Sequence, residues 1–187
     1  QNKLEQFCPT PQDFGGIAGN TGDQSSALNL WLLAVSSNHI CGYWPAGTYR
    51  ITSALATINN QSFSIHGAGG YQTVLNYAGI NTTNDIMSFA GTSGGHLNNI
   101  LLNGFRITSA TSMTAGNALH LTYVDYSALN DIIIDSNVIG NHNIYDGVFF
   151  ENSSLNSYIG FNVYTSHYGI KADNGVELNL EIGRASC

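Results

Sequence analysis

Short apolar segments recur along the second half of the chain, each flanked by glycine, asparagine and serine. Apolar and polar residues alternate within several of these segments, which is the pattern of a β-strand with one buried face. A first set lies at residues 97–104, 129–136, 156–163 and 177–183, and a second set interleaves with it at residues 117–123, 147–152 and 169–174. Both sets become more closely spaced toward the C-terminus, and they do so together. This shared change indicates two strands in each turn of one repeating coil.

The repeat also predicts how successive turns stack. We align Ile100, Ile132, Ile159 and Leu180 in the first set, and Leu119, Val148 and Ile170 in the second. Two short strands cannot bury their apolar faces alone, so several turns must stack with their strands in parallel. A β-sandwich would need hairpin turns about every 8–12 residues, and no Asn-Gly or Asp-Gly pattern organises this chain in that way. The prediction is an all-β protein, a right-handed single-stranded parallel β-helix.

Helical spacing of apolar residues is convincing only within residues 12–35. Asp23 or Ser25 can cap a helix there, and Leu28 and Trp31 belong to its apolar face. A strand, a Pro-Ala-Gly turn and a second strand follow the helix. The pattern therefore predicts a helix that precedes the coil.

These elements give one continuous domain in two parts. Residues 1–51 form an N-terminal head with a capping α-helix, and residues 52–187 form the rungs of the parallel β-helix. The last predicted strand ends at Gly183 without a polar capping segment, which a solenoid needs to remain soluble. We interpret this end as the truncation of a longer coil or as one end of an assembly.

Three stretches of the head carry distinctive motifs: Gln12-Asp13-Phe14-Gly15, the loop from Gly19 to Asp23, and Trp44-Pro45-Ala46-Gly47-Thr48-Tyr49-Arg50-Ile51. They resemble the N-terminal head of the pectate-lyase-like β-helix superfamily. In that family a D-[FY]-G-A-x-G-D-G segment leads a helix that caps the solenoid, and a Pro-Ala/Pro-Gly-x-Tyr motif opens the first rung. The resemblance covers about residues 12–80 by motif, and the aspartate-rich segment is diluted at residues 16–20.

The resemblance implies a class of function. The superfamily includes phage tailspikes and tail appendages, pectin-degrading enzymes and fungal glucanases. The asparagine-rich, weakly charged rungs are most similar to the phage tailspike branch. This likeness implies a polysaccharide partner, a virion (phage tail) or extracellular location, and a homotrimer.

Composition excludes other partners. Charged residues make up 9% of the chain, and the formal net charge is −7 with only 5 Lys and Arg. Nucleic-acid binding needs clustered basic side chains, so no nucleic-acid partner is expected. The longest strongly apolar stretch, Leu28–Val35, is too short to cross a bilayer, so no membrane insertion is expected.

Cysteine and histidine patterns give little support for a cofactor. Cys8, Cys41 and Cys187 match no zinc pattern. A Cys8–Cys41 disulfide would suit an oxidising compartment, and unpaired thiols are the alternative that the sequence leaves open. The histidines show no ligand spacing, and no dense Asp/Glu loop supports Ca²⁺, which some members of the superfamily bind. We therefore predict no metal and no cofactor.

Stacking of the second set predicts columns of polar side chains on one outer face. Equivalent residues of successive turns lie about 4.8 Å apart, the strand spacing within a sheet. The predicted columns are Thr122–Glu151–Asp173, His120–Phe149–Lys171 and Tyr123–Asn152–Asn174. Glu151 and Asp173 would be neighbouring carboxylates, at a separation near the roughly 5–5.5 Å of retaining glycosidases. We predict Glu151 and Asp173 as the catalytic acid and nucleophile.

The predicted substrate-binding residues flank this pair and are His120, Phe149, Lys171 and Tyr123. Phe149 would stack against a sugar ring. In the plainer interpretation the outward carboxylates are ordinary solvated surface, and Lys171 balances their charge. A further column, Asn103–Asp135–Asn162, is predicted to be a structural ladder at a turn, because Asn and Asp favour such positions.

Two classes of function remain. The first is a polysaccharide-recognising protein that depolymerises its ligand, either as a glycoside hydrolase or as a polysaccharide lyase that acts by β-elimination. The second is a non-enzymatic adhesive or structural solenoid. In a third interpretation the chain is a fragment of a larger β-helix enzyme whose active site lies beyond Cys187. The sequence does not choose between them.

Overall fold

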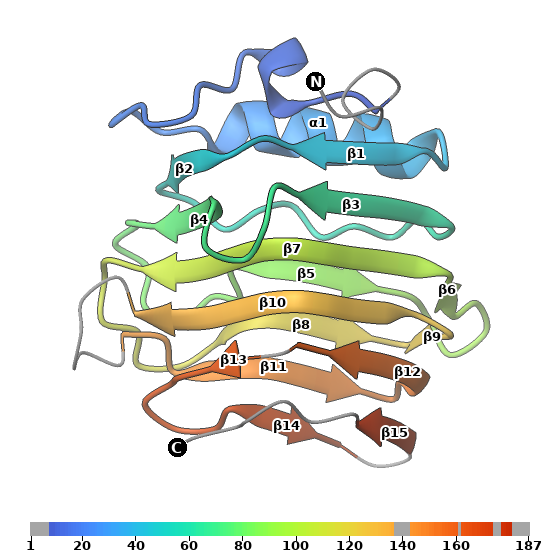
Figure 1. The fold of residues 1–187 in the computed structure, drawn as a ribbon. Coiled ribbons are helices and arrows are strands. Elements are labelled where there is room, and N and C mark those ends of the chain that lie inside the picture. The colour runs from blue at the N-terminus through green and yellow to red at the C-terminus, as the bar shows by residue number, and fades with distance from the viewer. Residues whose placement is uncertain (1–7, 137–142, 161, 174–176, 181–187) are drawn as a thin grey trace.

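The computed structural model describes residues 8–136, 143–160, 162–173 and 177–180. In this part of the chain the protein is mostly β, with parallel strands stacked in successive layers and one α-helix across the N-terminal end (Figure 1). A short 3₁₀ helix, Pro11–Phe14, precedes that helix. The expectation of a largely β chain with a single α-helix is confirmed.

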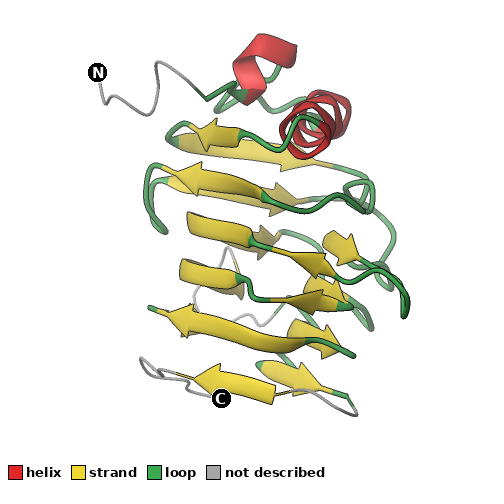
Figure 2. Cartoon of the chain, turned by 90° about the vertical axis from the view of Figure 1, so that its right-hand side faces the viewer, coloured by secondary structure: helices red, strands yellow, loops and turns green. Residues whose placement is uncertain are grey.

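Parallel strands form two main sheets. The large sheet contains β1 (Cys41–Trp44), β2 (Gly47–Ile51), β3 (Phe63–Gly67), β4 (Thr73–Tyr77), β7 (Ile100–Ser109), β10 (Ala128–Ser136), β12 (Ser154–Ile159), β13 (Asn162–Val163) and β15 (Glu177–Leu180). The four-stranded sheet contains β5 (Met87–Ala90), β8 (Asn117–Thr122), β11 (Asp146–Glu151) and β14 (Ile170–Ala172), and a small third sheet pairs β6 (Leu97–Asn98) with β9 (Val124–Asp125). From β7 onward the chain passes back and forth between the two main sheets, adding β8, β11 and β14 to one and β10, β12 with β13, and β15 to the other (Figure 2).

The core lies between these sheets and is built from columns of apolar side chains. In the large sheet, Ile65, Leu102 and Leu129 lie opposite one another, and each is at most 1% exposed. In the four-stranded sheet, Leu119 and Val148 pair in the same way. Because side chains alternate along a strand, each inward column leaves polar neighbours on the outer face. Full burial of each aliphatic side chain contributes about 1.5–3 kcal/mol to stability.

Helix α1 (Ser25–Ser37) lies across the N-terminal end of the stack, as Figures 1 and 2 show. Trp31 and Leu32 are buried from its inner face, and the Trp31 ring lies 5.3 Å from the ring of Trp44 in β1. Asp23 fixes the start of the helix, because its carboxylate accepts hydrogen bonds from the backbone N–H groups of Ser25 and Thr52. The helix begins inside the range 12–35 that the apolar spacing predicts and ends two residues beyond it, at Ser37.

A disulfide joins Cys8 to Cys41, the first residue of β1, and so ties the N-terminal segment to the stack. The sequence left this pairing open against free thiols. Cys187 lies outside the described residues.

Backbone positions with positive φ also stack in columns. All the non-glycine residues of this kind in the described chain fall at equivalent places in successive turns, where side chains normally disfavour that conformation. They belong to three columns: His39, Ser62, Asn99 and Tyr126; Gly104, Asp131 and Gly160; and Tyr123 with Asn152. In each column the chain changes direction at the same position of successive turns. The coil therefore has recurring corners set by backbone geometry as well as by glycine.

The predicted stacking of the second set is found, whereas that of the first set is wrong. Val148 lies opposite Leu119 and Ile170. In the first set, Ile132 lies opposite Phe105 instead of Ile100. Strands β7 and β10 run on through the stacked bend at Gly104 and Asp131, so they are longer than the repeated motif. Aligning the motifs by apolar pattern alone shifts their register across that bend.

Other predicted alignments are also wrong. Ile159 lies opposite Asn130 across the same bend, and Leu180 lies opposite Tyr158, on a strand pair whose register shifts between Ser154 and Asn156. The column Asn103–Asp135–Asn162 does not exist, because the register sets Asn103 opposite Asn130, Asp135 opposite Thr108, and Asn162 opposite Ile133. Asp135 is instead held by Arg106, whose Nε and Nη2 donate to its two carboxylate oxygens over 2.6 and 2.8 Å.

Candidate functional site

The outer face of the four-stranded sheet brings together most of the predicted site residues. His120 of β8, Phe149 of β11 and Lys171 of β14 lie opposite one another in one row. Two residues farther along the strands, Glu151 lies opposite Thr122. Asp173 follows directly after β14, where its backbone N–H donates to the carbonyl of Phe150 over 2.9 Å. The rows of the sheet thus set Glu151 and Asp173 on neighbouring turns.

His120 is the most highly connected side chain on this face. Its Nδ1 lies 2.7 Å from Oδ2 of Asp85, and its Nε2 lies 3.3 Å from Oε2 of Glu151. The hydroxyl of Thr122 lies 3.1 Å from the same Nε2 and donates to Oε2 of Glu151 over 3.2 Å. An imidazole with one carboxylate at each nitrogen forms a continuous chain of polar contacts, Asp85–His120–Glu151, which crosses three turns of the coil.

Asp85 is held rigidly in place before β5. Its Oδ1 accepts hydrogen bonds from the backbone N–H of Asn117 over 2.8 Å and from the side-chain Nδ2 of Asn117 over 2.6 Å. Its other oxygen faces His120. Burial alone would raise the pKa of Asp85, but the hydrogen bonds from His120 and Asn117 outweigh it and lower that pKa. Asp85 is therefore a fixed negative charge beside His120.

The two carboxylates favour the protonated form of His120. Burial opposes this form, but the hydrogen bond and charge of Asp85, followed by the charge and hydrogen bond of Glu151, outweigh burial and raise the pKa of His120. A protonated imidazole donates from both nitrogens, and both face acceptors here. His120 can therefore orient Glu151 by donating a hydrogen bond to it.

Phe149 lies between His120 and Lys171 on the same face. The rings of Phe149 and His120 stack with their centroids 4.7 Å apart and an interplanar angle of 27°. The Nζ of Lys171 lies 4.4 Å from the centroid of the Phe149 ring, within the range of a cation–π contact. Phe149 is half-buried, whereas Lys171 and Asp173 are exposed. The face therefore offers an apolar ring edged by charged and hydrogen-bonding groups.

The remaining predicted binding residue, Tyr123, lies at a corner of the coil. It follows the last residue of β8 in a left-handed conformation, with φ 52°. Its ring contacts that of His96, with centroids 5.1 Å apart. The structure therefore groups Tyr123 with His96 and not with the row of Phe149. Asn174, which the sequence placed beside it, lies outside the described residues.

The sequence analysis missed Asp85, which completes the site. A signal for it exists, because Asp85, Asn117 and Asp146 each stand two residues before an inward apolar residue of their turn. Residues 85–90 are an earlier copy of the second set, with Met87 opposite Leu119. Recognising that copy would have placed Asp85 next to the turn that carries His120.

Two other histidine–aspartate pairs lie at corners of the coil. His96 Nδ1 is 2.6 Å from Asp125 Oδ2, and His167 Nδ1 is 2.9 Å from Asp146 Oδ1. Each aspartate also accepts a backbone N–H of the next turn, from Ser154 and Tyr168 respectively. Within the described chain, neither histidine is within ion-pair distance of a second carboxylate. These pairs fasten one turn to the next.

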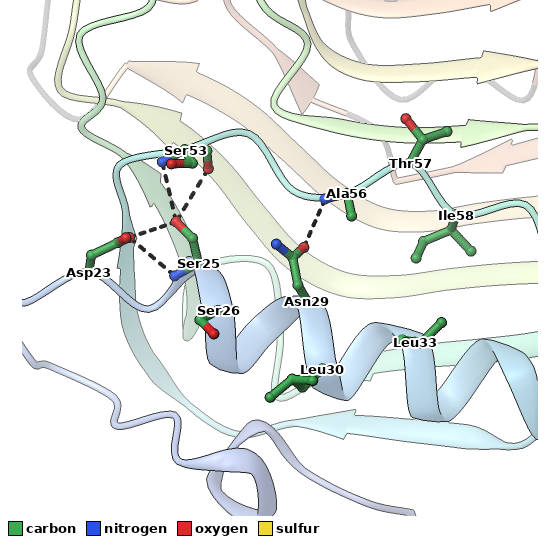
Figure 3. Close-up of a pocket in the computed structure, with 10 residues that line it drawn as sticks. All are labelled: Asp23, Ser25, Ser26, Asn29, Leu30, Leu33, Ser53, Ala56, Thr57 and Ile58. Atoms are coloured by element: carbon green, nitrogen blue, oxygen red, sulfur yellow. Dashed lines mark hydrogen bonds between the residues drawn. The ribbon is translucent and has the colours of Figure 1, made fainter.

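A separate groove of about 490 Å³ runs beside α1 (Figure 3). Leu30 and Leu33 line one side of it, and the segment from Ser53 to Ile58 lines the other. Asn29 Oδ1 accepts the backbone N–H of Ala56, which joins the helix to that segment. The only titratable side chain in the lining is Asp23, and it is occupied by donors at the helix start. This groove has no group placed for catalysis.

No group of three or more His, Cys, Asp or Glu side chains suited to a metal ion occurs among the described residues. In the same part of the chain, none of the helices is long and apolar enough to span a membrane. The side chains on the outer face of the four-stranded sheet supply carboxylates, an imidazole, an ammonium group and an aromatic ring.

Comparison with solved structures identifies proteins that share this fold. Geobacillus virus E2 ORF18 superposes with a TM-score of 0.62 at 16% identity, covering 85% of this chain. The A-modules of the Azotobacter vinelandii mannuronan C-5 epimerases AlgE6 and AlgE4 superpose with TM-scores of 0.64 and 0.56, at 13% and 11% identity, covering 86% and 87% of this chain.

The match extends over part of each of those proteins, namely 42% of the viral chain and 44% and 53% of the two epimerase modules. No protein-family model matches the chain, and neither does any curated protein sequence. At these identities the likeness shows a shared fold: this chain has the architecture of a viral protein and of modules from polysaccharide-modifying enzymes.

Proposed function

We propose that this chain is a right-handed single-stranded parallel β-helix that binds a polysaccharide across the outer face of its four-stranded sheet. Parallel strands joined by crossovers take the right-handed connection almost without exception. The alternation of the chain between two parallel sheets supports a coil in which each turn forms one rung. The strands of successive turns lie side by side on this face, which suits an extended ligand.

The row His120–Phe149–Lys171 supports a sugar as the ligand. The faces of the Phe149 ring are covered by His120 and Lys171, so the weakly apolar C–H groups of a pyranose would pack against the outward edge of this row. The hydroxyl groups at the edge of the sugar need hydrogen-bonding partners, and Glu151, Thr122 and Lys171 surround Phe149 with them. Mannuronan C-5 epimerases, whose name states a polysaccharide substrate, share the fold. The likeness to a viral protein supports an extracellular or virion location.

The chain Asp85–His120–Glu151 carries the proposal of catalysis. Glu151 accepts hydrogen bonds from His120 and Thr122 and stands one turn from Asp173. Strand spacing sets such neighbours about 4.8 Å apart, which is compatible with a pair of carboxylates that acts on a glycosidic bond. Glu151 and Asp173 would serve as the two carboxyl groups of hydrolysis, and His120 would orient Glu151.

The same contacts favour hydrolysis over β-elimination with histidine as the base. A base must be unprotonated to accept the sugar C–H proton. His120 lies between two carboxylates that favour its protonated form, and its raised pKa reflects this. We therefore assign His120 as a hydrogen-bond donor to Glu151. This assignment makes glycoside hydrolase the preferred activity.

The test is a panel of bacterial capsular polysaccharides and plant acidic polysaccharides. New reducing ends would be followed together with the absorbance of unsaturated uronates. Hydrolysis predicts reducing ends without that absorbance, and their loss in Glu151→Gln. Asp131→Asn, which changes a carboxylate on the large sheet, is the matched control and should retain activity. Unsaturated products would assign a lyase instead.

A non-enzymatic adhesive is the second candidate, and one observation favours it. Histidine–aspartate pairs also fasten turns at Asp125 and Asp146, so the Asp85–His120 pair has structural counterparts in the same chain. An adhesin would bind a polysaccharide of the panel and would produce neither new reducing ends nor unsaturated uronates. Light scattering tests the associated proposal of a homotrimer, which predicts three times the monomer mass.

A further inference from the structure

A second aromatic cluster lies where the chain enters β11 and β14. Tyr145 directly precedes β11, and His167 and Tyr168 shortly precede β14. The rings of Tyr145 and His167 stack with centroids 4.6 Å apart and an interplanar angle of 23°. The rings of His167 and Tyr168 have their centroids 3.8 Å apart, with an interplanar angle of 56°. Three rings from two successive turns thus form one cluster, which we call the entry cluster.

A buried carboxylate holds the entry cluster in place. Asp146 is 5% exposed, and its Oδ1 accepts from Nδ1 of His167 and from the backbone N–H of Tyr168 over 3.1 Å. The backbone N–H of His167 donates to the carbonyl of Tyr145 over 3.0 Å. A rigid aromatic surface loses little conformational entropy when a ligand stacks on it, which favours binding. The cluster is therefore organised before any ligand arrives.

The exposure of the cluster fits a ligand that is partly apolar and partly polar. Tyr168 is 50% exposed, and the side chain of His167 is 40% exposed. Among the described residues, the hydroxyls of Tyr145 and Tyr168 and the Nε2 of His167 have no hydrogen-bond partner. A sugar satisfies both requirements, because its ring stacks on an aromatic face while its hydroxyls meet the polar edges.

The strands connect the entry cluster to the row of Phe149. Tyr145 and Phe149 belong to one continuous segment, and four residues of strand extend over about 13 Å. His167 and Lys171 are separated by the same number of positions on the next turn. That distance exceeds one sugar ring and is spanned by a short oligosaccharide.

We propose that Tyr145, His167 and Tyr168 form a second sugar-binding subsite of the same polysaccharide site, with Phe149 at the first. This inference rests on the proposed function, since it extends the proposed ligand along β11 and β14. The subsite contributes affinity for longer oligosaccharides and takes no part in bond cleavage. Its ligand is a pyranose of the bound polysaccharide.

The test uses a ladder of oligosaccharides, from disaccharide to hexasaccharide, made from whichever polysaccharide of the panel the native protein retains. Isothermal titration would measure affinity for each length. Tyr168→Ala is expected to weaken binding of the longest oligosaccharides about tenfold and to leave that of the disaccharide unchanged, whereas Phe149→Ala weakens both. His167→Gln, which keeps a donor for Asp146, should repeat the effect if truncation of Tyr168 disturbs the fold.

Tyr71→Ala is the matched control, because Tyr71 is 74% exposed in the connection between β3 and β4 of the large sheet. It should bind every length as the native protein does. Native affinity at all lengths in both Tyr168→Ala and His167→Gln, with binding lost in Phe149→Ala, would overturn the second subsite alone. Failure of the native protein to retain any polysaccharide would overturn the proposed function and the subsite with it.

Discussion

Three histidine–aspartate pairs occur in this chain, and their surroundings separate one of them from the other two. At the corners, Asp125 and Asp146 each hold a histidine with one carboxylate oxygen. Asp125 accepts a backbone N–H of the next turn with its other oxygen, and Asp146 accepts one with the same oxygen. On the four-stranded sheet, Asp85 also fastens the next turn, through Asn117. The difference lies in His120, whose second nitrogen faces Glu151.

Exposure follows the same division. The side chains of Asp125 and Asp146 are 13% and 8% exposed, whereas those of Asp85 and Glu151 are 26% and 35% exposed. A buried carboxylate that satisfies backbone donors mainly stabilises the fold, because its removal leaves those donors unpaired. A more exposed one at the end of a histidine chain can meet a ligand. The comparison teaches that one local contact serves two purposes, according to what the far side of the imidazole faces.

The largest expected effect is on turnover. His120→Ala removes the group that orients Glu151, and we expect the rate of polysaccharide cleavage to fall about 10²-fold, the usual cost of displacing a catalytic group by roughly 1 Å. His96→Ala, at a corner pair, should change turnover little. Release of reducing ends under saturating substrate measures both variants. Equal losses in the two variants would remove the distinction between the pairs.

The next effect is on stability. Asp125→Ala leaves His96 and the backbone N–H of Ser154 without their acceptor, which should lower the free energy of unfolding by about 1–3 kcal/mol. Asp85→Ala should cost less, because the Asp85 side chain is 26% exposed, against 13% for Asp125, so water can reach the donors that it leaves. Urea unfolding followed by circular dichroism compares the two. A larger loss in Asp85→Ala would reverse the assignment.

A smaller effect concerns the pKa of His120. Asp85→Asn removes the nearest negative charge and should lower this pKa, because the charge and hydrogen bond of Asp85 are the chief causes that raise it. NMR titration of labelled histidine ring carbons measures the change. Asp131→Asn on the large sheet is the control and should leave the titration of His120 unaltered.

The smallest effect is the dependence of stability on pH. Because folding raises the pKa of His120, its contribution is complete below the unfolded value near 6.5 and is lost as pH rises through the folded value. Because folding lowers the pKa of Asp85, its contribution is present above 3.8 and is lost as pH falls through the folded value. The stability difference between the native protein and His120→Gln should therefore be greatest between about 3.8 and 6.5. A difference that grows above this range would contradict the assigned directions.

The candidate site illustrates how far pattern alone reaches. The second set of repeats has short strands without an internal bend, so its apolar alternation gave the register of Leu119, Val148 and Ile170, and with it the row of Phe149. The first set crosses the stacked left-handed bend at Gly104 and Asp131, which shifts the alternation without leaving a gap in the sequence. The predicted alignment of the first set is wrong because it ignores this bend.

The residues that only the structure located act through space over long stretches of chain. Asp85 and His120 are 35 positions apart, and the strand that follows Asp85 has no distinctive motif beyond its Met-Ser-Phe-Ala alternation. Tyr123 was assigned to the face by counting, yet its positive φ turns it to the corner beside His96. Side-chain direction at a corner depends on φ, which residue type sets only weakly for tyrosine.

The sequence by itself determined the β-rich character of the chain, its helix at the N-terminal end and the presence of carboxylate, imidazole and aromatic side chains on one outer face. These follow from local alternation and repetition, which survive in any stack of parallel turns. The tertiary structure alone decided which carboxylate faces which histidine. Contacts of that kind depend on register and on the bends between strands, and a shift of a single residue would point each side chain to the other face of the sheet.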